Sequence, residues 1–309
     1  MTTTTDTAAP ADAAPAGDTM RGFSLALAAY LFWGVLPLFM KLVAHLPTLE
    51  VLAHRALWSL PIALVVLLWI GGMADLRRVL GSPRSLMQAA LAATFISVNW
   101  GIHVWAISVD RALETALGYY INPLLTTLLG AVLLRETMTR AQIVAMCLAA
   151  AAVAVLTWDA GGLPWVSLVL AGSWGVYAFL KRTLPVGPTQ GFSVEVLILS
   201  VPALGFVGWL EATGQGHLFA RGGYDALLFV GCGITTAVPL LIYASGAKLL
   251  RLSTMGLMQY IAPTMVFLIA VFVFGEPFRL ATLVAFVLIW TGLAIYTWSL
   301  LARNRTARA

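Results

Sequence analysis

The chain has 309 residues, of which 61% are apolar and 10% are charged, with a formal net charge of +5. An ordinary soluble domain carries about 25% charged residues, so this composition excludes a typical soluble fold. The basic residues stand singly or in pairs between apolar runs, a pattern that excludes the contiguous basic face of a nucleic-acid-binding protein.

The N-terminal segment is rich in Thr, Ala and Pro and cannot bury a core, so residues 1–21 are predicted to form a disordered cytoplasmic tail. The apolar run that follows lacks the basic region and small-residue cleavage site of a secretory signal peptide. We therefore expect this run to be retained as a helix. A short basic cytoplasmic tail is expected at residues 302–309.

Apolar runs follow one another from residue 22 to residue 301, with short polar breaks between them. A membrane-spanning helix needs about 20 mostly apolar residues. The pattern predicts an all-α membrane protein with ten transmembrane helices, near 22–43, 52–71, 86–109, 112–134, 140–158, 162–181, 190–211, 225–248, 254–274 and 279–301. Only Asp110 and Arg111 separate the third run from the fourth, so nine spans with one long hairpin is the alternative.

The distribution of Lys and Arg between the spans predicts the orientation, because basic residues near span ends stay on the cytoplasmic side. With the N-terminus inside, the inner segments hold 13 of the 18 basic residues. The outer side keeps Lys41, Arg55, Arg111, Arg221 and Arg279. Both termini are therefore predicted to lie in the cytoplasm.

The chain matches itself at an offset of 140 or 141 residues. The Trp-Gly-Val at 33–35 falls on that at 174–176, and the Tyr-Ile-Asn-Pro at 120–123 falls on Tyr-Ile-Ala-Pro at 260–263. Glu136 falls on Glu276 in the same register. These matches use residues that are less common than Leu or Ala, so they indicate an internal repeat.

The repeat divides the chain into two halves, residues 22–158 and 162–301, with five predicted spans each. An odd number of spans forces the second half to enter the membrane from the opposite side, so the two five-helix repeats are predicted to be inverted. Transporters built this way hold their solute where the repeats meet, near the middle of the membrane. The alternative is a duplication that only enlarged a helix bundle.

Several segments resemble the EamA group of the drug/metabolite transporter superfamily, and within it the RarD proteins, which are named for chloramphenicol sensitivity. The resemblance implies a bacterial inner-membrane permease with ten helices and no cofactor, and it leaves the substrate undefined. The segments are LALAAYLFWGVLPLFMKL at 25–42, VLAHRALWSLP at 51–61, VNWGIHVWA at 98–106, LETALGYYINPLL at 113–125 and RLSTMGLMQYIAPTMVFLIAVFVFGE at 251–276.

Polar and aromatic residues inside the spans are the candidates for a solute cavity. Unpaired polar groups are expensive in hydrocarbon and therefore face protein or water, and small-molecule sites combine apolar walls with a few polar contacts. The candidate cavity residues are Trp33, Asn99, Trp100, His103, Tyr119, Tyr120, Asn122, Trp174, Tyr177, Tyr243, Gln259 and Tyr260.

Two ionisable residues are candidates for proton coupling. His103 titrates near physiological pH in its unperturbed state, although a neutral packing role is the alternative. Glu195 falls on His54 in the repeat, and an ion pair with a basic side chain of a neighbouring helix is the favoured alternative for it. Pro123 and Pro263 are expected to kink their spans at matching places, either to expose a carbonyl to a cavity or only to shape the packing.

These features predict a secondary permease that exports or exchanges a small organic metabolite or drug by alternating access. No metal, cofactor or enzymatic activity is expected, and Cys147 and Cys232 lack the spacing of a disulfide or metal site. The expected partners are the solute and membrane lipids, with a homodimer left open. A membrane enzyme acting on lipid-linked substrates and a non-transporting scaffold are the alternative functions.

Overall fold

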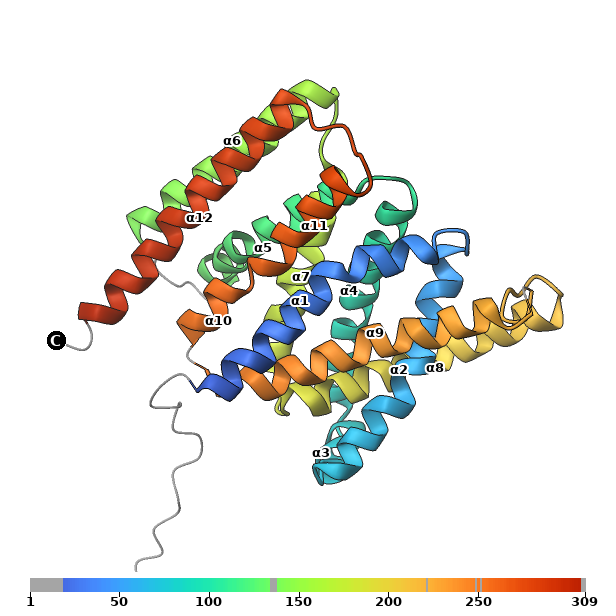
Figure 1. The fold of residues 1–309 in the computed structure, drawn as a ribbon. Helices are drawn as coiled ribbons and strands as arrows, with labels where there is room; N and C mark the ends of the chain where they lie inside the picture. Colours follow the sequence, from blue (N-terminus) through green and yellow to red (C-terminus); the bar gives the residue numbers. More distant parts are fainter. Residues whose placement is uncertain (1–18, 134–137, 221, 248, 251, 307–309) are drawn as a thin grey trace, which may run out of the picture.

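The computed structural model describes residues 19–133, 138–220, 222–247, 249–250 and 252–306 (Figure 1). These residues form twelve α-helices and, within the described ranges, no strand. Residues 1–18 and 307–309 of the expected tails, and Glu136 of the repeat, lie outside the described residues. The bounds are α1 Met20–Leu42, α2 Thr48–Trp69, α3 Met73–Leu80, α4 Pro83–Ser108, α5 Ala112–Leu133, α6 Arg140–Ala160, α7 Trp165–Thr183, α8 Pro188–Ala212, α9 Tyr224–Ala247, α10 Leu252–Met258, α11 Ile261–Phe272 and α12 Leu280–Thr306.

Seven helices are long and apolar enough to cross a membrane: α1, α2, α4, α6, α8, α9 and the Leu280–Ser299 part of α12. Two shorter apolar segments, Trp165–Lys181 of α7 and the whole of α11, accompany them. The chain is therefore a multi-pass helical membrane protein.

Polar side chains mark where several helices begin. The Thr19 hydroxyl accepts a hydrogen bond from the backbone N–H of Gly22 at the start of α1. Thr139 and Gln142 form a reciprocal capping box at the start of α6. Asp110 adopts a left-handed backbone with φ of 57° between α4 and α5. The chain turns there, so the third and fourth predicted spans are two separate helices.

The structure adds detail at three places. The segment between the second and third predicted spans contains the short helix α3, which buries Leu76 and Val79 and exposes Arg77 and Arg78. Helix α1 begins at Met20 and α12 continues to Thr306, so both extend a few residues beyond the predicted spans.

The ninth predicted span is interrupted instead of continuous. It consists of α10 and α11, with residues 259 and 260 between them. Pro263 has no backbone N–H to donate to the carbonyl of Gln259, which lies four residues earlier, and this missing bond weakens the helix at the break. Pro123 has the same place in α5, which stays helical throughout.

Eight of the helical units form a closed ring. In order around it, each packing against the next, are α2, α9, α1, α11, α5, α7, α4 and α8, and α8 packs against α2 again. Helices α1, α2, α4 and α5 belong to the first half of the chain, and the other four belong to the second half. The ring therefore alternates between the two halves.

Helices α6 and α12 lie outside this ring and pack along each other, as the upper left of Figure 1 shows. Gly292 lets them approach closely, because a side chain there would meet the backbone of Ala145. Both helices also contact α5. All of the extensive helix contacts among the described residues, those of the ring and the α6–α12 pair, join one half of the chain to the other.

Candidate functional site

A group of polar and aromatic side chains lies inside the ring, where α2 approaches α4 across it. We call this group the central polar cluster; its members are Arg55 of α2, Trp100 and His103 of α4, Tyr119 of α5 and Thr236 of α9. Because these contacts join helices that are not all neighbours in the ring, the cluster fills part of its interior.

Arg55 is the centre of the cluster and is 3% exposed. Its Nε–H donates a hydrogen bond to Thr236 Oγ1 at 3.0 Å, and the hydroxyl of Thr236 donates in turn to the carbonyl of Cys232 at 2.7 Å. Its guanidinium lies 4.8 Å from the centroid of the Trp100 ring, a cation–π contact. Its Nη1 has no hydrogen-bond partner among the described residues, nor does Arg55 form an ion pair with any of them.

His103 is 4% exposed, and neither of its ring nitrogens has a hydrogen-bond partner in the described part of the chain. Its ring lies against that of Tyr119, with centroids 5.7 Å apart. Arg55 lies near enough to His103 and Tyr119 for its charge to contribute to the electrostatic environment of both. His54, the neighbour of Arg55 in the sequence, stacks its ring on that of Phe229, with the ring centroids 3.9 Å apart.

The cluster lies nearer one end of the helices than the other. Arg55 is the eighth residue of α2, Tyr119 is the eighth of α5, and His103 is the sixth from the end of α4. At 1.5 Å per residue this depth is roughly 10 Å. Val51 and Ile107 share one apolar core at that end, which separates the cluster from the surface.

Asn99 faces a neighbouring helix instead of the cluster. Its Nδ2 donates to the carbonyl of Leu170 at 2.9 Å and to the hydroxyl of Ser173 at 3.0 Å, both on α7. The shared helix face expected for Asn99 and His103 therefore serves two different contacts. Asn122 is buried on α5, and its Oδ1 has no partner among the described residues.

The remaining aromatic candidates form three groups. Trp33 and Tyr243 meet Tyr30 in a triad with centroids 5.4 to 5.7 Å apart, which joins α1 to α9. Trp174 and Tyr177 contact each other on α7 at 5.7 Å. The triad is separate from the central polar cluster in these contacts, whereas Trp174 and Tyr177 share an apolar core with Trp100 of that cluster.

Tyr120 and Tyr260 form the third group, and their rings stack 6.4 Å apart. The Tyr120 hydroxyl is hydrogen-bonded to that of Thr264. These residues open onto a cavity of about 460 Å³ between α5, the α10–α11 break and α12. Gln259 lies at the break itself. The cavity is lined by Tyr120, Leu257, Tyr260, Thr264, Trp290, Leu293, Ala294, Thr297 and Trp298.

Glu195 belongs to a buried ion pair. Its carboxylate is 2.8 Å from Lys181 Nζ and accepts a hydrogen bond of 3.1 Å from the Tyr177 hydroxyl. Glu195 is on α8 and the other two are on α7, so this is the ion pair with a neighbouring helix that the sequence favours. The pairing leaves Glu195 with a clear structural role.

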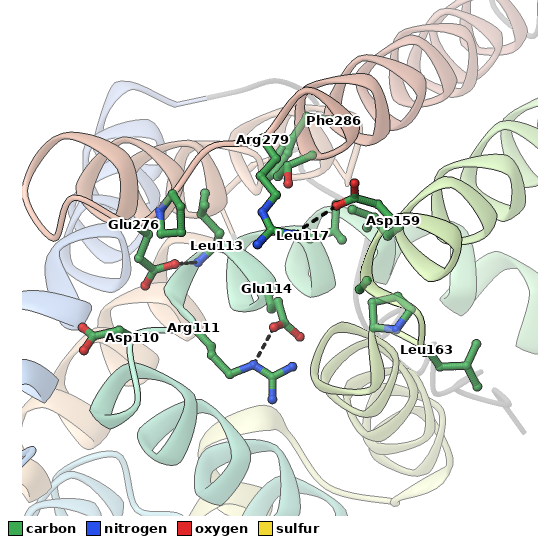
Figure 2. A pocket seen from close by; sticks show the side chains of 15 residues that line it. Asp110, Arg111, Leu113, Glu114, Leu117, Asp159, Leu163, Glu276, Arg279 and Phe286 are labelled. Carbon is green, nitrogen blue, oxygen red and sulfur yellow. Dashed lines mark hydrogen bonds and ion pairs between the residues drawn. The ribbon is translucent and has the colours of Figure 1, made fainter.

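A second cavity, of about 260 Å³, lies at the end of the molecule where α5 begins (Figure 2). Arg111 pairs there with Glu114, and Arg279 with Asp159. The Glu276 carboxylate accepts the backbone N–H groups of Ala112 and Leu113, the latter at 2.8 Å, and so caps α5. Burial raises the pKa of Glu276 above its ordinary value, and these two donors oppose the shift.

Sequence reasoning missed the most informative residue of the site. Arg55 is assigned above to the outer basic residues, and this assignment is wrong, because Arg55 lies inside α2 and is buried. The signal was available: a His-Arg pair stands within an apolar run, and an Arg inside a span is expected to face the interior of the bundle. Thr236 carries no comparable signal in the sequence.

Metal binding has no support in the described residues, which hold no group of three or more His, Cys, Asp or Glu side chains suited to a metal ion. The site consists instead of one buried cation, hydrogen-bonding groups and aromatic faces. Side chains of these kinds can form hydrogen bonds and aromatic contacts with a polar organic molecule.

The fold and the site define a multi-pass helical membrane protein with a polar, cationic interior enclosed by two interleaved halves. The profile of the EamA-like transporter family matches residues 20–158. RarD of Streptomyces exfoliatus is 40% identical, over 93% of this chain and 91% of its own. RarD of Escherichia coli (strain K12) is 35% identical over 95% and 99% of the two chains. The uncharacterized transporter YojE of Bacillus subtilis (strain 168) is 37% identical over 94% and 98%.

This chain therefore belongs to the EamA-like transporter family and is similar to its RarD members. A crystal structure with 21% identity aligns with 92% of this chain and 98% of its own, with a TM-score of 0.57. That likeness extends the agreement to the fold over nearly the whole chain.

Proposed function

We propose that the protein is a secondary transporter that moves a small organic solute across the bacterial inner membrane by alternating access. The observation that carries this proposal is the central polar cluster, a buried cation with unpartnered polar atoms inside a ring of helices that alternates between the two halves. Burying ionisable and polar groups inside a membrane protein costs free energy, and such groups mark solute or ion pathways.

The same contacts support two inverted five-helix repeats. The pair α1–α9 corresponds to α7–α4 under the repeat, and α1–α11 corresponds to α7–α5; all four pairs pack extensively. The pairs α2–α8, α5–α11 and α6–α12 each join a helix to its own counterpart. Ten spans follow if α5, α7 and the α10–α11 pair are added to the seven long apolar helices.

The names of the relatives point in the same direction, since several are called transporters. The excess of basic residues in alternate segments supports an orientation with both termini in the cytoplasm. Export or exchange is the mode that we propose. The cluster would face one side of the membrane and then the other as the seams between the halves open in turn.

Site-directed labelling tests the alternating exposure. In a background with Cys147 and Cys232 replaced by Ala, Asn122→Cys places a thiol on α5 inside the ring, one turn beyond Tyr119. We expect a small membrane-impermeant thiol reagent to label it from either side of sealed vesicles. Ala152→Cys is the control: it is fully buried on α6, away from the ring, and should stay unlabelled.

A transport assay completes the test. Compounds whose release differs between cells lacking and cells overproducing the protein are identified by mass spectrometry of the medium. Each is then assayed for counterflow in proteoliposomes. An Asn122→Cys variant labelled from neither side, together with proteoliposomes that exchange none of the compounds, would contradict alternating access.

A further inference from the structure

Arg55 is a buried cation that has no counter-ion in the described part of the chain, and the proposed function leaves this feature unexplained. Its side chain is 3% exposed, and its polar contacts are the Thr236 hydroxyl and the face of Trp100. A guanidinium remains protonated inside proteins. Burying it without an anion is costly, and buried charges are ordinarily paired.

The buried acidic side chains of α2 and α8, two helices that pack against each other, are engaged elsewhere. Glu50, on the same helix, accepts the backbone N–H and ring Nδ1 contacts of His217, at 2.8 and 2.7 Å. Glu195, which the repeat places opposite His54, is held by Lys181. Within the described residues no acidic side chain pairs with Arg55, which leaves its charge available to an anion from outside the chain.

The contacts leave one nitrogen of the guanidinium for that anion. The Nε–H is used by Thr236 and one flat face by Trp100, whereas Nη1 has no partner among the described residues. The ring nitrogens of His103, on the same helix as Trp100, are also without partners there. A carboxylate is suited to a guanidinium with an unpartnered N–H group, and a second hydrogen-bond donor in the same cluster adds to its binding.

Resting on the proposed function, we propose that the transported solute is a small organic monoanion and that its carboxylate binds to Arg55, with His103 as a second donor. One unpaired cation matches one negative charge. The rings of Trp100 and Tyr119 form apolar walls for the body of the solute. A dianionic phosphate would place a second negative charge in the cluster without a second cation to balance it.

Ligand binding to the full-length protein in detergent tests this assignment. The probes are acetate, benzoate and indole-3-acetate, each compared with its neutral amide, and phenyl phosphate is included as the dianion. We expect at least one carboxylate to raise the melting temperature and quench tryptophan fluorescence, with an affinity at least about tenfold above that of its amide. Phenyl phosphate should bind more weakly than benzoate.

Variants of Arg55 assign the effect to the cluster. Arg55→Met should abolish the preference for the carboxylate over the amide. Arg55→Lys keeps the positive charge but loses the planar set of N–H donors, so it should retain part of this preference. Arg279→Met removes an exposed cation at the second cavity and should change nothing. Because the comparison of acid with amide is made on the unsubstituted protein, it does not depend on how well a variant folds.

Three results would overturn the assignment: amides that bind as tightly as their acids, no binding by any carboxylate, or an acid preference that persists in Arg55→Met. Tighter binding of phenyl phosphate would also exclude a monoanion. If proteoliposomes exchange only neutral or cationic compounds, the transport function is supported and the proposal of an anionic solute is contradicted. If they exchange nothing while carboxylates still bind through Arg55, the anion site is supported and the transport function is contradicted.

Discussion

The two halves of the chain treat buried charge in opposite ways. At an offset of 141 residues, His54 and Arg55 of the first half correspond to Glu195 and Val196 of the second. Glu195 is neutralised by Lys181 within its own half, whereas Arg55 has no acidic partner among the described residues. The difference separates a charge that holds the structure together from one that is available to a ligand.

Lys181→Met should give the largest effect on stability and is the most direct test of the difference between Glu195 and Arg55. It strands the carboxylate of Glu195, and removing one partner of a buried ion pair costs about 3 to 5 kcal/mol. Chemical unfolding in detergent micelles measures the loss. Lys181→Met combined with Glu195→Gln should recover much of it.

Arg55→Met is the matched substitution in the first half. Since no carboxylate of the described residues pairs with Arg55, its loss should leave the free energy of unfolding unchanged or raise it, in the absence of added solute. Equal destabilisation by Arg55→Met and Lys181→Met would show that the two sites do not differ in the way described here.

Gly233→Ala tests whether binding at Arg55 depends on the close packing of α9 against α2. A Cβ at Gly233 would lie under 3.0 Å from the backbone of Trp58, and the Ser59 hydroxyl donates to the Gly233 carbonyl at 3.2 Å. Pushing α9 away from α2 should cost about 1 to 3 kcal/mol and weaken binding at Arg55. Gly208→Ala on α8 meets no atom within 4 Å and is the control. Equal effects of the two substitutions would argue against the close contact.

Asn99→Ala distinguishes a packing contact from a solute contact on the same helix as His103. It removes two hydrogen bonds to α7, and such bonds contribute about 1 kcal/mol in membrane proteins. The free energy of unfolding should fall by about 1 kcal/mol in total, while carboxylate binding stays unchanged. Thr94→Ala, which removes an exposed bond within α4, sets the baseline. A loss of carboxylate binding without a loss of stability would show that Asn99 contacts the solute instead.

Glu276→Gln tests an acid whose partners are backbone groups, and its effect should be the smallest. Burial raises the pKa of Glu276 above 4.5, so the folded protein binds this proton more tightly than the unfolded chain does. Its contribution to stability is full below pH 4.5 and is lost as the pH rises through the folded pKa. Melting temperatures between pH 4 and 8 should therefore converge or cross for the unsubstituted protein and Glu276→Gln. Parallel curves would contradict the shift.

The sequence predicted the helices well because apolar length and the offset of 140 residues are local or repetitive signals. It predicted a disturbed helix at both Pro123 and Pro263, but it could not tell that the helix breaks near Pro263 while α5 stays continuous. It listed Trp100, His103 and Tyr119 as cavity residues, but could not group them around Arg55. That grouping arises where helices far apart in the sequence meet, and no local pattern encodes it.

The alternation of the halves around the ring also has a consequence for synthesis. The helices of the first half find their main packing surfaces on helices that are made later. During translation the helices of the first half are therefore made before their final neighbours exist. The site around Arg55 is complete only after α9, which carries Thr236, has been synthesised.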